Sequence, residues 1–510
     1  MALRSLFPNL RSINPPYTVS SWRSISSRAL SIDIADEPAP FNKDHEDLKS
    51  RILRLIFPRR SASTVLQNWV DEGHKASISE LRRISKQLMK RRRYKHALEI
   101  FTWMEAQERF RISAADHAIR LELITKVLSL REAEEYFANI SDTSSQKAAC
   151  LPLLHSYVKE RATNKAESLM LHMNGLGVNV SPHPFNEMMK LYMATSQHHK
   201  VPSIIMQMKQ NKIPRNVLSY NLWMSAYGEL SGAASAEMVY KEMLNDKYVE
   251  VGWSSLSTLA NIYLKSGHPN KATLALRNAE KKLSTCNHLG YFFLITLYAS
   301  LNDKDGVLRL WEACKAVEGR ITCANYMCIL LCLVKLSDIG EAEKVFMEWE
   351  SSCMKYDIRV SNVLLGAYMR NGLMEKAESL HLRTLERGGC PNYKTWEILM
   401  EGWVKSQNMD KAICAMKKGF AMLKHCNWRP SPGIVVPIAE YFEKTGNLED
   451  AKQYVKVIRF LGLANLLVYK SLLRMHVHTQ RPIQDILKMM QNDKIDMDDE
   501  TSALVQEFKV

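Results

Sequence analysis

A repeat of about 35 residues organises most of this chain. The segments Cys323 to Asp357 and Ile358 to Asn392 align without a gap. Each has an apolar run, a short break and a second amphipathic run, which predicts two helices joined by a turn. A helix pair that recurs at a fixed period favours an array in which each unit packs on its neighbours.

A small residue in the second predicted helix tracks the repeat along the chain. Successive small residues are 33 to 39 residues apart, and they are Ala97, Ala133, Ala166, Val201, Ala236, Ala272, Val307, Ala342, Ala377, Ala412 and Ala451. About nine residues before most of them lies a bulky residue such as Tyr192 or Tyr368, which we interpret as core material between helices. Since strand signals are missing, the sequence predicts an all-α fold, a right-handed superhelical α-solenoid of helix–turn–helix repeats.

The ends of the chain differ from the array. Residues 1–32 are rich in Arg and Ser and contain no acidic residue. This composition is typical of an organelle transit peptide, and a disordered basic tail is the alternative. We expect a linker and N-terminal capping helices over 33–77, about 11 or 12 repeats over 78–500, and a tail over 501–510. The repeats are clearest over 147–181, 182–216, 217–252, 253–287, 288–322, 323–357, 358–392, 393–431 and 432–466.

The net charge and the cysteines indicate which kinds of partner and compartment suit the chain. A net charge of +15 and a pI near 9.2 fit a polyanion such as nucleic acid, although scattered solvated lysines give the same total. The ten cysteines include no CxxC, so we expect Cys328 and Cys332 to be buried in a reducing compartment rather than to bind zinc. Because no run of about 20 apolar residues exists, we expect no membrane insertion.

Catalytic motifs are missing from the sequence. It has no Walker motif, no GxSxG, no HExxH and no HxE followed by CxxC of the zinc deaminases. We therefore expect a protein that is not an enzyme and that needs no metal and no cofactor.

Three stretches carry a resemblance to a known family. They are VLSYNLWMSAY from Val217, PHPFNEMMKLY from Pro182 and IRVSNVLLGAY from Ile358. Together with the repeat ends KIPRN and GGCPN, they resemble pentatricopeptide repeats (PPR) of the P class found in plant organelles. A tetratricopeptide array is the nearest competitor, but its 34-residue period and its Gly between the Trp and Tyr of the first helix are not seen. The resemblance covers the chain from about Ile78 to the C-terminus.

The resemblance implies a way of reading RNA. PPR proteins bind single-stranded RNA at about one base per repeat, and residues at repeat positions 5 and 35 read the base edge. On this chain the implied base-reading pairs are Asn186 with Asn216, Asn221 with about Gly252, Ser257 with Asn287, and Asn362 with Asn392. In the family, Asn with Asn favours pyrimidines, and a small hydroxyl with Asn favours adenine.

An amide suits this role because it offers both a donor and an acceptor to a Watson–Crick edge. Asn is also a common helix-start residue, and this remains the alternative. Other repeats do not fit the code, because position 5 holds Leu151, Phe292, Met327, Glu397 and Val436. We therefore expect base reading in only a few repeats.

Cations recur at repeat position 13, in the last turn of the first predicted helix. They are Lys90, Lys126, Lys159, Lys265, Lys335, Arg370, Lys405 and Lys444, and the exceptions are Ala194, Glu229 and Ser300. One cation per repeat matches a phosphate backbone with one nucleotide per repeat. A cation near a helix C-terminus is also favoured by the helix dipole alone. We expect these side chains to contact RNA phosphates.

Together these features predict a non-catalytic single-stranded RNA-binding protein of an organelle, the mitochondrion before the chloroplast. It would act in transcript stability, processing or translation, with an organellar ribosome or RNA-processing proteins as further candidate partners. The rival hypothesis is a structural helical scaffold, for example a ribosome-associated subunit that works through protein and ribosomal RNA contacts. The weak base code favours this rival.

Overall fold

The computed structural model describes residues 47–55, 60–107, 110–178, 180–425 and 428–507. The expected transit peptide over 1–32 lies outside these ranges. Within them, every regular element is a helix. The expected all-α fold of repeated helix–turn–helix units is confirmed, and the division of the chain into numbered repeats stays a prediction.

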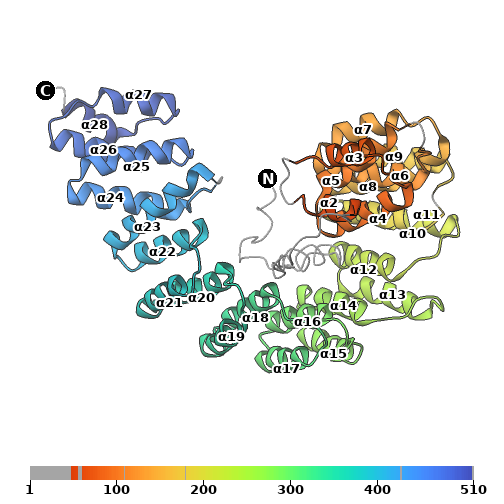
Figure 1. Ribbon diagram of the computed structural model, residues 1–510. Helices are drawn as coiled ribbons and strands as arrows, with labels where there is room; N and C mark the ends of the chain where they lie inside the picture. The colour runs from red at the N-terminus through yellow and green to blue at the C-terminus, as the bar shows by residue number, and fades with distance from the viewer. Residues whose placement is uncertain (1–46, 56–59, 108–109, 179, 426–427, 508–510) are drawn as a thin grey trace. The chain divides into compact units, whose positions relative to one another are not determined.

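The described residues form two compact units, one ending at Ser284 and the other beginning at Thr285. In each unit, helices follow one another as hairpins (Figure 1). We call the helix that opens a hairpin its first helix and the helix that closes it its second helix.

In the first unit, α2 (Leu48–Leu53) and α3 (Ala62–Asp71) precede the hairpins. The hairpins are α4 (Ile78–Lys90) with α5 (Tyr94–Glu105), α6 (Ala114–Val127) with α7 (Leu130–Ala138), α8 (Thr143–Lys159) with α9 (Thr163–Gly175), α10 (Pro182–Ala194) with η1 (His198–Lys200) and α11 (Val201–Gln210), α12 (Val217–Ser231) with α13 (Ala233–Asn245), and α14 (Trp253–Lys265) with α15 (Pro269–Glu280). Ser61 begins α3, since its hydroxyl accepts a hydrogen bond from the Ser63 backbone N–H.

The second unit is built in the same way. Its hairpins are α16 (Leu289–Ser300) with α17 (Lys304–Lys315), α18 (Cys323–Lys335) with α19 (Ile339–Ser352), α20 (Ile358–Arg370) with α21 (Met374–Glu386), α22 (Tyr393–Lys405) with α23 (Met409–Ala421), α24 (Val435–Thr445) with α25 (Leu448–Phe460), and α26 (Leu466–His478) with α27 (Gln484–Asn492). The short 3-10 helices η2 (Met422–His425) and η3 (Pro432–Ile434) lie between α23 and α24, and α28 (Asp499–Glu507) follows the last hairpin.

The expected tail over 501–510 is helical as far as it is described. Lys470 of α26 forms ion pairs with Asp498 at 2.5 Å and with Glu500 at 2.7 Å. The side chain of Thr501 is fully buried, and its backbone N–H donates to the Asp498 carboxylate at 3.0 Å. These contacts hold α28 against the last hairpin.

The small residues that mark the repeat lie in the core, as expected from their spacing. Ala342 and Ala377 are 0% exposed. The bulky residues of the first helices are also buried, for example Tyr298 and Trp403, whereas Tyr227 is only half-buried. A small side chain on one helix and a large one on its neighbour allow the two helices to pack closely.

Two further sequence expectations concern cysteines and membranes. Cys332 is buried and Cys328 is half-buried, and the cysteines of the described ranges are all free. No group of three or more His, Cys, Asp or Glu side chains within those ranges is arranged to hold a metal ion. Among the described helices, none combines the length and apolar character that a membrane span requires.

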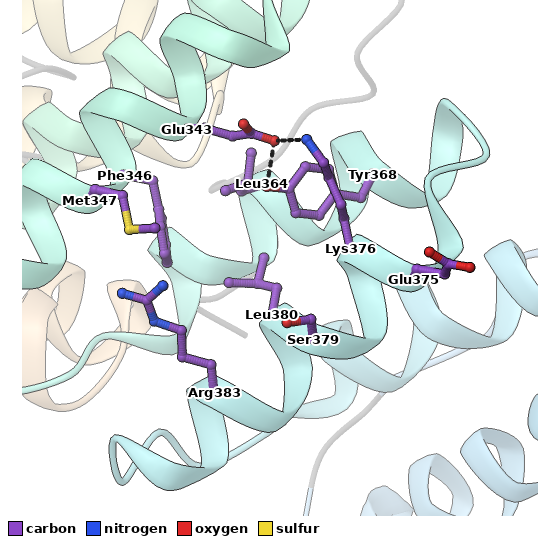
Figure 2. A pocket seen from close by; sticks show the side chains of 10 residues that line it. All are labelled: Glu343, Phe346, Met347, Leu364, Tyr368, Glu375, Lys376, Ser379, Leu380 and Arg383. Atoms are coloured by element: carbon purple, nitrogen blue, oxygen red, sulfur yellow. Dashed lines mark hydrogen bonds and ion pairs between the residues drawn. The ribbon is translucent and has the colours of Figure 1, made fainter.

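A Tyr–Glu–Lys cluster joins several hairpins to the preceding one. Glu343 of α19 accepts hydrogen bonds from Tyr368 Oη of α20 at 2.9 Å and from Lys376 Nζ of α21 at 2.7 Å. Figure 2 shows Tyr368 and Lys376 both directed at Glu343, at one end of a pocket lined by apolar and charged side chains. The Lys376 ammonium also lies 5.8 Å from the centre of the Tyr368 ring, which adds a cation–π attraction.

The same cluster recurs in the first unit. Glu167 accepts from Tyr192 and Lys200, at 2.9 and 2.8 Å. Glu237 accepts from Tyr263 and Lys271 at the same two distances. In each case the lysine hydrogen bond is the main reason that the pKa of the glutamate is lowered. The cluster therefore stabilises the contact between adjacent hairpins through a charged carboxylate.

We predict that Glu343→Gln lowers the free energy of unfolding by about 1 kcal/mol, because it removes a charged acceptor that two side chains share. Denaturant unfolding followed by circular dichroism measures this change. Glu375→Gln is the matched control, since Glu375 is an exposed carboxylate of the neighbouring helix. An equal loss of stability in both variants would refute a specific role for the cluster.

The lowered pKa values predict an acid-sensitive array. The unfolded chain binds protons at these carboxylates at a higher pH than the folded chain does. Their stabilisation is therefore present above about pH 4.5, the ordinary pKa of Glu, and is lost as the pH falls through the folded pKa. The free energy of unfolding should drop below pH 4.5 in the native chain, and less steeply in a Glu167→Gln, Glu343→Gln double variant. Parallel pH profiles would contradict this assignment.

Candidate nucleic-acid interface

The first helices of neighbouring hairpins pack against one another. In the first unit α6 packs on α8 and α12 on α14, and in the second unit α16 packs on α18, α18 on α20 and α20 on α22. Because each first helix repeats the same register, residues at one repeat position come to lie beside each other along the row. Positions 5 and 13 are both on these helices.

The pair Asn186 and Asn216 is in direct contact. Asn186 Nδ2 donates to Asn216 Oδ1 at 3.2 Å. A third residue completes the site, since the Ser219 hydroxyl donates to Asn186 Oδ1 at 2.8 Å. Asn216 also caps α12, because its Oδ1 accepts from the Ser219 backbone N–H at 3.0 Å.

The pair Asn362 and Asn392 repeats this arrangement in the second unit. Asn362 Nδ2 donates to Asn392 Oδ1 at 3.2 Å, and the Thr395 hydroxyl donates to Asn362 Oδ1 at 3.0 Å. Asn392 caps α22 through the Thr395 backbone N–H at 3.1 Å. We call each set an amide triad: Asn186, Asn216 and Ser219 in one unit, and Asn362, Asn392 and Thr395 in the other.

Hydrogen bonding inside the amide triads changes what they offer to a base. All amide oxygens of both triads already accept from the protein. Asn216 Oδ1 and Asn392 Oδ1 each accept several hydrogen bonds, whereas Asn186 Oδ1 and Asn362 Oδ1 each accept one and keep a second lone pair. The two members of each pair also differ in exposure. Asn186 and Asn362 are 1% and 8% exposed, whereas Asn216 and Asn392 are half-buried.

The third implied pair lacks one amide. Asn221 lies in α12, and its expected partner position holds Gly252, the residue that precedes α14. Asn221 Oδ1 is buried without a hydrogen-bond partner in the described part of the chain. This repeat therefore has one asparagine where the amide triads have two.

The fourth implied pair divides between the two units. Ser257 is fully buried in the first unit, and its hydroxyl donates to the Trp253 carbonyl at 2.7 Å. Asn287 is exposed in the second unit, where its Oδ1 accepts from the Leu289 backbone N–H at 2.8 Å. Each of the two side chains thus hydrogen-bonds the backbone of a residue close to it in the sequence, and no contact between the two residues is formed within a unit.

All eight position-13 cations lie in the last turn of a first helix. All eight residues are exposed. Lys335 Nζ donates to Ser300 Oγ at 3.0 Å, and Lys265 forms an ion pair with Glu229. Because Ser300 and Glu229 occupy position 13 of the preceding repeats, these contacts place successive position-13 side chains on the same side of the row.

Four of these cations follow one another without interruption in the second unit, namely Lys335, Arg370, Lys405 and Lys444. Arg370 is exposed, yet desolvation by the surrounding protein lowers its pKa. In the first unit Lys126 pairs with Glu122 of its own helix. The second unit therefore carries the longer run of adjacent cations.

An acidic spot interrupts this side of the second unit. Glu397, at position 5 of its repeat, forms an ion pair with Lys394 at 2.6 Å. One turn later in α22, burial and then the charge of Glu397 raise the pKa of Glu401. A phosphate or a base edge would meet negative charge here, which agrees with the poor fit of this repeat to the code.

The residues that sequence reasoning missed are Ser219 and Thr395. Both follow an asparagine by three residues, in the segments Asn216-Val-Leu-Ser219 and Asn392-Tyr-Lys-Thr395. This spacing is that of a helix capping box, so the sequence held a signal for the contact with Asn216 and Asn392. The contact with the previous first helix depends on how the hairpins stack and has no such signal.

Comparisons with known proteins agree with the repeat architecture. The family model described as "Pentatricopeptide repeat domain" matches residues 168–230, and the model "PPR repeat" matches residues 218–248 and 360–389. A solved structure with a similar fold is that of the pentatricopeptide repeat protein PPR10 from maize. It has a TM-score of 0.51 and 16% identity, and the match covers 88% of this chain and 68% of that chain.

Curated relatives extend the similarity over nearly the whole chain. Pentatricopeptide repeat-containing protein At5g27460 of Arabidopsis thaliana is 56% identical over 475 residues, which cover 92% of this chain and 96% of the relative. Pentatricopeptide repeat-containing protein At4g21705, mitochondrial, from the same plant is 31% identical and covers 90% of this chain and 94% of its own length. With helix hairpins at the family's period and relatives that match over nine-tenths of both chains, the chain belongs to the pentatricopeptide repeat family.

Proposed function

We propose that this chain is a non-catalytic protein that binds single-stranded RNA along the row of its first helices. The observation that carries this proposal is the line of position-13 cations on one side of that row. Lys335, Arg370, Lys405 and Lys444 provide one positive charge in each of four consecutive repeats. Phosphates of a strand that advances one nucleotide per repeat would meet one cation each.

The amide triads support a degree of sequence preference. They lie on the same first helices as the cations, and amide N–H groups can donate to acceptors on a base. Only two complete triads occur in the described ranges, so we propose that most of the affinity comes from phosphates and that base contacts add preference at a few nucleotides.

We further propose that the protein works in an organelle, with the mitochondrion ahead of the chloroplast. The Arg- and Ser-rich segment 1–32 supports this location, as do the relatives that carry "mitochondrial" in their names. A bound strand would be shielded from exonucleases or kept from pairing. Either effect changes transcript stability, processing or translation without any catalysis.

A structural scaffold remains the second candidate function, in which the chain binds an organellar ribosome through protein and ribosomal RNA contacts. The Glu397–Lys394 ion pair at a base-reading position favours it, because this repeat cannot read a base in that arrangement. Sedimentation of organelle extracts separates the two candidates. A scaffold should sediment with large ribosomal particles before and after treatment with a ribonuclease specific for single strands. A protein that binds single-stranded RNA should leave the fast-sedimenting fractions after that treatment.

We predict that Lys335→Ala with Arg370→Ala weakens binding of every RNA sequence alike. Loss of two phosphate contacts should reduce the slope of log affinity against log salt concentration by about 1.4. Fluorescence anisotropy with 12-nucleotide RNAs over a range of potassium chloride concentrations measures this slope.

The matched control for that variant is Lys344→Ala with Lys456→Ala. It removes the same charge from second helices, where both lysines are exposed. An equal change of slope in both double variants would mean that total charge, rather than the position-13 line, attracts RNA.

We predict that Asn362→Ala with Asn392→Ala lowers affinity for a preferred RNA by about 1–3 kcal/mol and leaves affinity for other RNAs nearly unchanged. Selection from a pool of randomised oligonucleotides and sequencing of the bound fraction identify the preferred RNA. The affinities of the native chain and the variant for this RNA and for other RNAs are then compared. Because Asn392 caps α22, Asn392→Ser serves as a control that keeps an oxygen for the cap but removes the amide N–H groups. If Asn392→Ser binds the preferred RNA as well as the native chain does, Asn392 does not read a base.

A further inference from the structure

A pocket lies at the C-terminal end of the row of first helices in the second unit. Its volume is about 430 Å³, within the range of about 300–1,000 Å³ that is usual for small-ligand sites. Its walls come from the C-terminal ends of α24 and α26 and from α28. The side chains that decide its chemistry are those of Glu443, Lys444, Arg474, Met475, His478 and Leu504. We call it the end pocket.

The end pocket continues the line of position-13 cations. Lys444 belongs to that line, and His478 is the thirteenth residue of α26, as the position-13 cations are of α18, α20 and α22. Both residues are exposed and have no ion-pair partner within the described ranges. Arg474 differs, since both Glu443 and Glu500 pair with it. The pocket therefore holds two donors without a carboxylate partner, an ammonium group and a histidine ring.

Helix α28 closes the row beyond this pocket. It packs on the first helix α26, as α24 does (Figure 1). The backbone N–H of Thr501 donates to Asp498, the residue before α28, in the way that Thr395 donates to Asn392 before α22. α28 therefore stands where the first helix of a further repeat would stand, and within the described residues no second helix follows it.

The charges around α28 do not suit a strand that runs on. Lys470, the fifth residue of α26, is 6% exposed and pairs with Asp498 and Glu500, so its charge is already neutralised. Asp496 and Asp499 are exposed carboxylates at the same end of the unit. Phosphates that advanced past α26 would meet this negative charge. A strand on the first helices should therefore end at the end pocket.

We propose that the end pocket binds the terminal phosphate of an RNA strand. This inference rests on the proposed RNA-binding function and deepens it, because it assigns one end of the strand to one end of the row. A terminal phosphate carries a charge of about −1.5 to −2 at neutral pH, more than a phosphate within the strand. Lys444 and His478 would donate to its oxygens, and Leu504 provides an apolar wall on the side of α28.

Three 12-nucleotide RNAs of one sequence test this inference and identify the end that is bound. One carries a 5′-phosphate, one carries a 3′-phosphate, and one has hydroxyl groups at both ends. Each has a fluorophore on an internal base, and anisotropy titrations of the full chain at one salt concentration measure the three affinities. One of the two terminal phosphates should raise the affinity about tenfold over the hydroxyl RNA. The other phosphate adds the same charge and should have little effect.

Two variants of the end pocket should remove this gain in affinity. Leu504→Trp fills the pocket without a change of charge, and His478→Ala removes one donor. His478→Lys places a cation at position 13, as in the preceding repeats, and should keep the gain. Lys405→Ala is the control, since Lys405 precedes the pocket by one repeat. It should weaken binding of all three RNAs alike and leave their ratios unchanged. Circular dichroism checks that each variant retains its helices.

The outcomes separate this inference from the proposed function. If the native chain binds none of the three RNAs, the proposed function is wrong and the inference fails with it. Equal affinity for the three RNAs leaves RNA binding in place and overturns the role of the end pocket. An equal gain from a phosphate at either end, or a gain that survives in Leu504→Trp and His478→Ala, also overturns it, because general charge attraction would then explain the gain.

Discussion

Close packing of each helix hairpin on the next one determines the rest of this structure. A single hairpin cannot bury its apolar face, so it is stable only against neighbours of the same shape. The fully buried Ala342 and Ala377 show how little space the contact leaves. Because the packing repeats at nearly constant intervals, polar residues that share a repeat position also share a side of the row. A regular row of cations or amides thus follows from the core.

The two helices of a hairpin carry different polar contacts. Second helices carry the glutamates of the Tyr–Glu–Lys clusters, such as Glu343, which bind to the next hairpin and neutralise the lysines there. First helices carry the position-13 cations, and Lys90, Lys159, Lys405 and Lys444 have no ion-pair partner within the described ranges. These four cations of the first helices therefore keep their charge free for a partner, on the helices where the proposed function places RNA.

The sequence was sufficient for features that depend on spacing alone. The repeat period, the buried small residues and the helix end occupied by each position-13 cation all follow from helical periodicity, and the structure agrees with them. It was not sufficient for contacts between hairpins. Nothing in the sequence indicates that Asn362 gives its oxygen to Thr395, since the two are 33 residues apart and meet only through stacking. For the same reason the unpartnered oxygen of Asn221 could not be foreseen.

Photo-crosslinking tests most directly whether RNA lies along the first helices. A single-stranded RNA with 4-thiouridine at successive positions is crosslinked to the full chain, and mass spectrometry identifies the attached residues. We expect crosslinks near positions 5 and 13 of first helices such as α18, α20 and α22, advancing by one repeat for each nucleotide. Crosslinks confined to second helices such as α19 and α21, or scattered without this advance, would contradict the account.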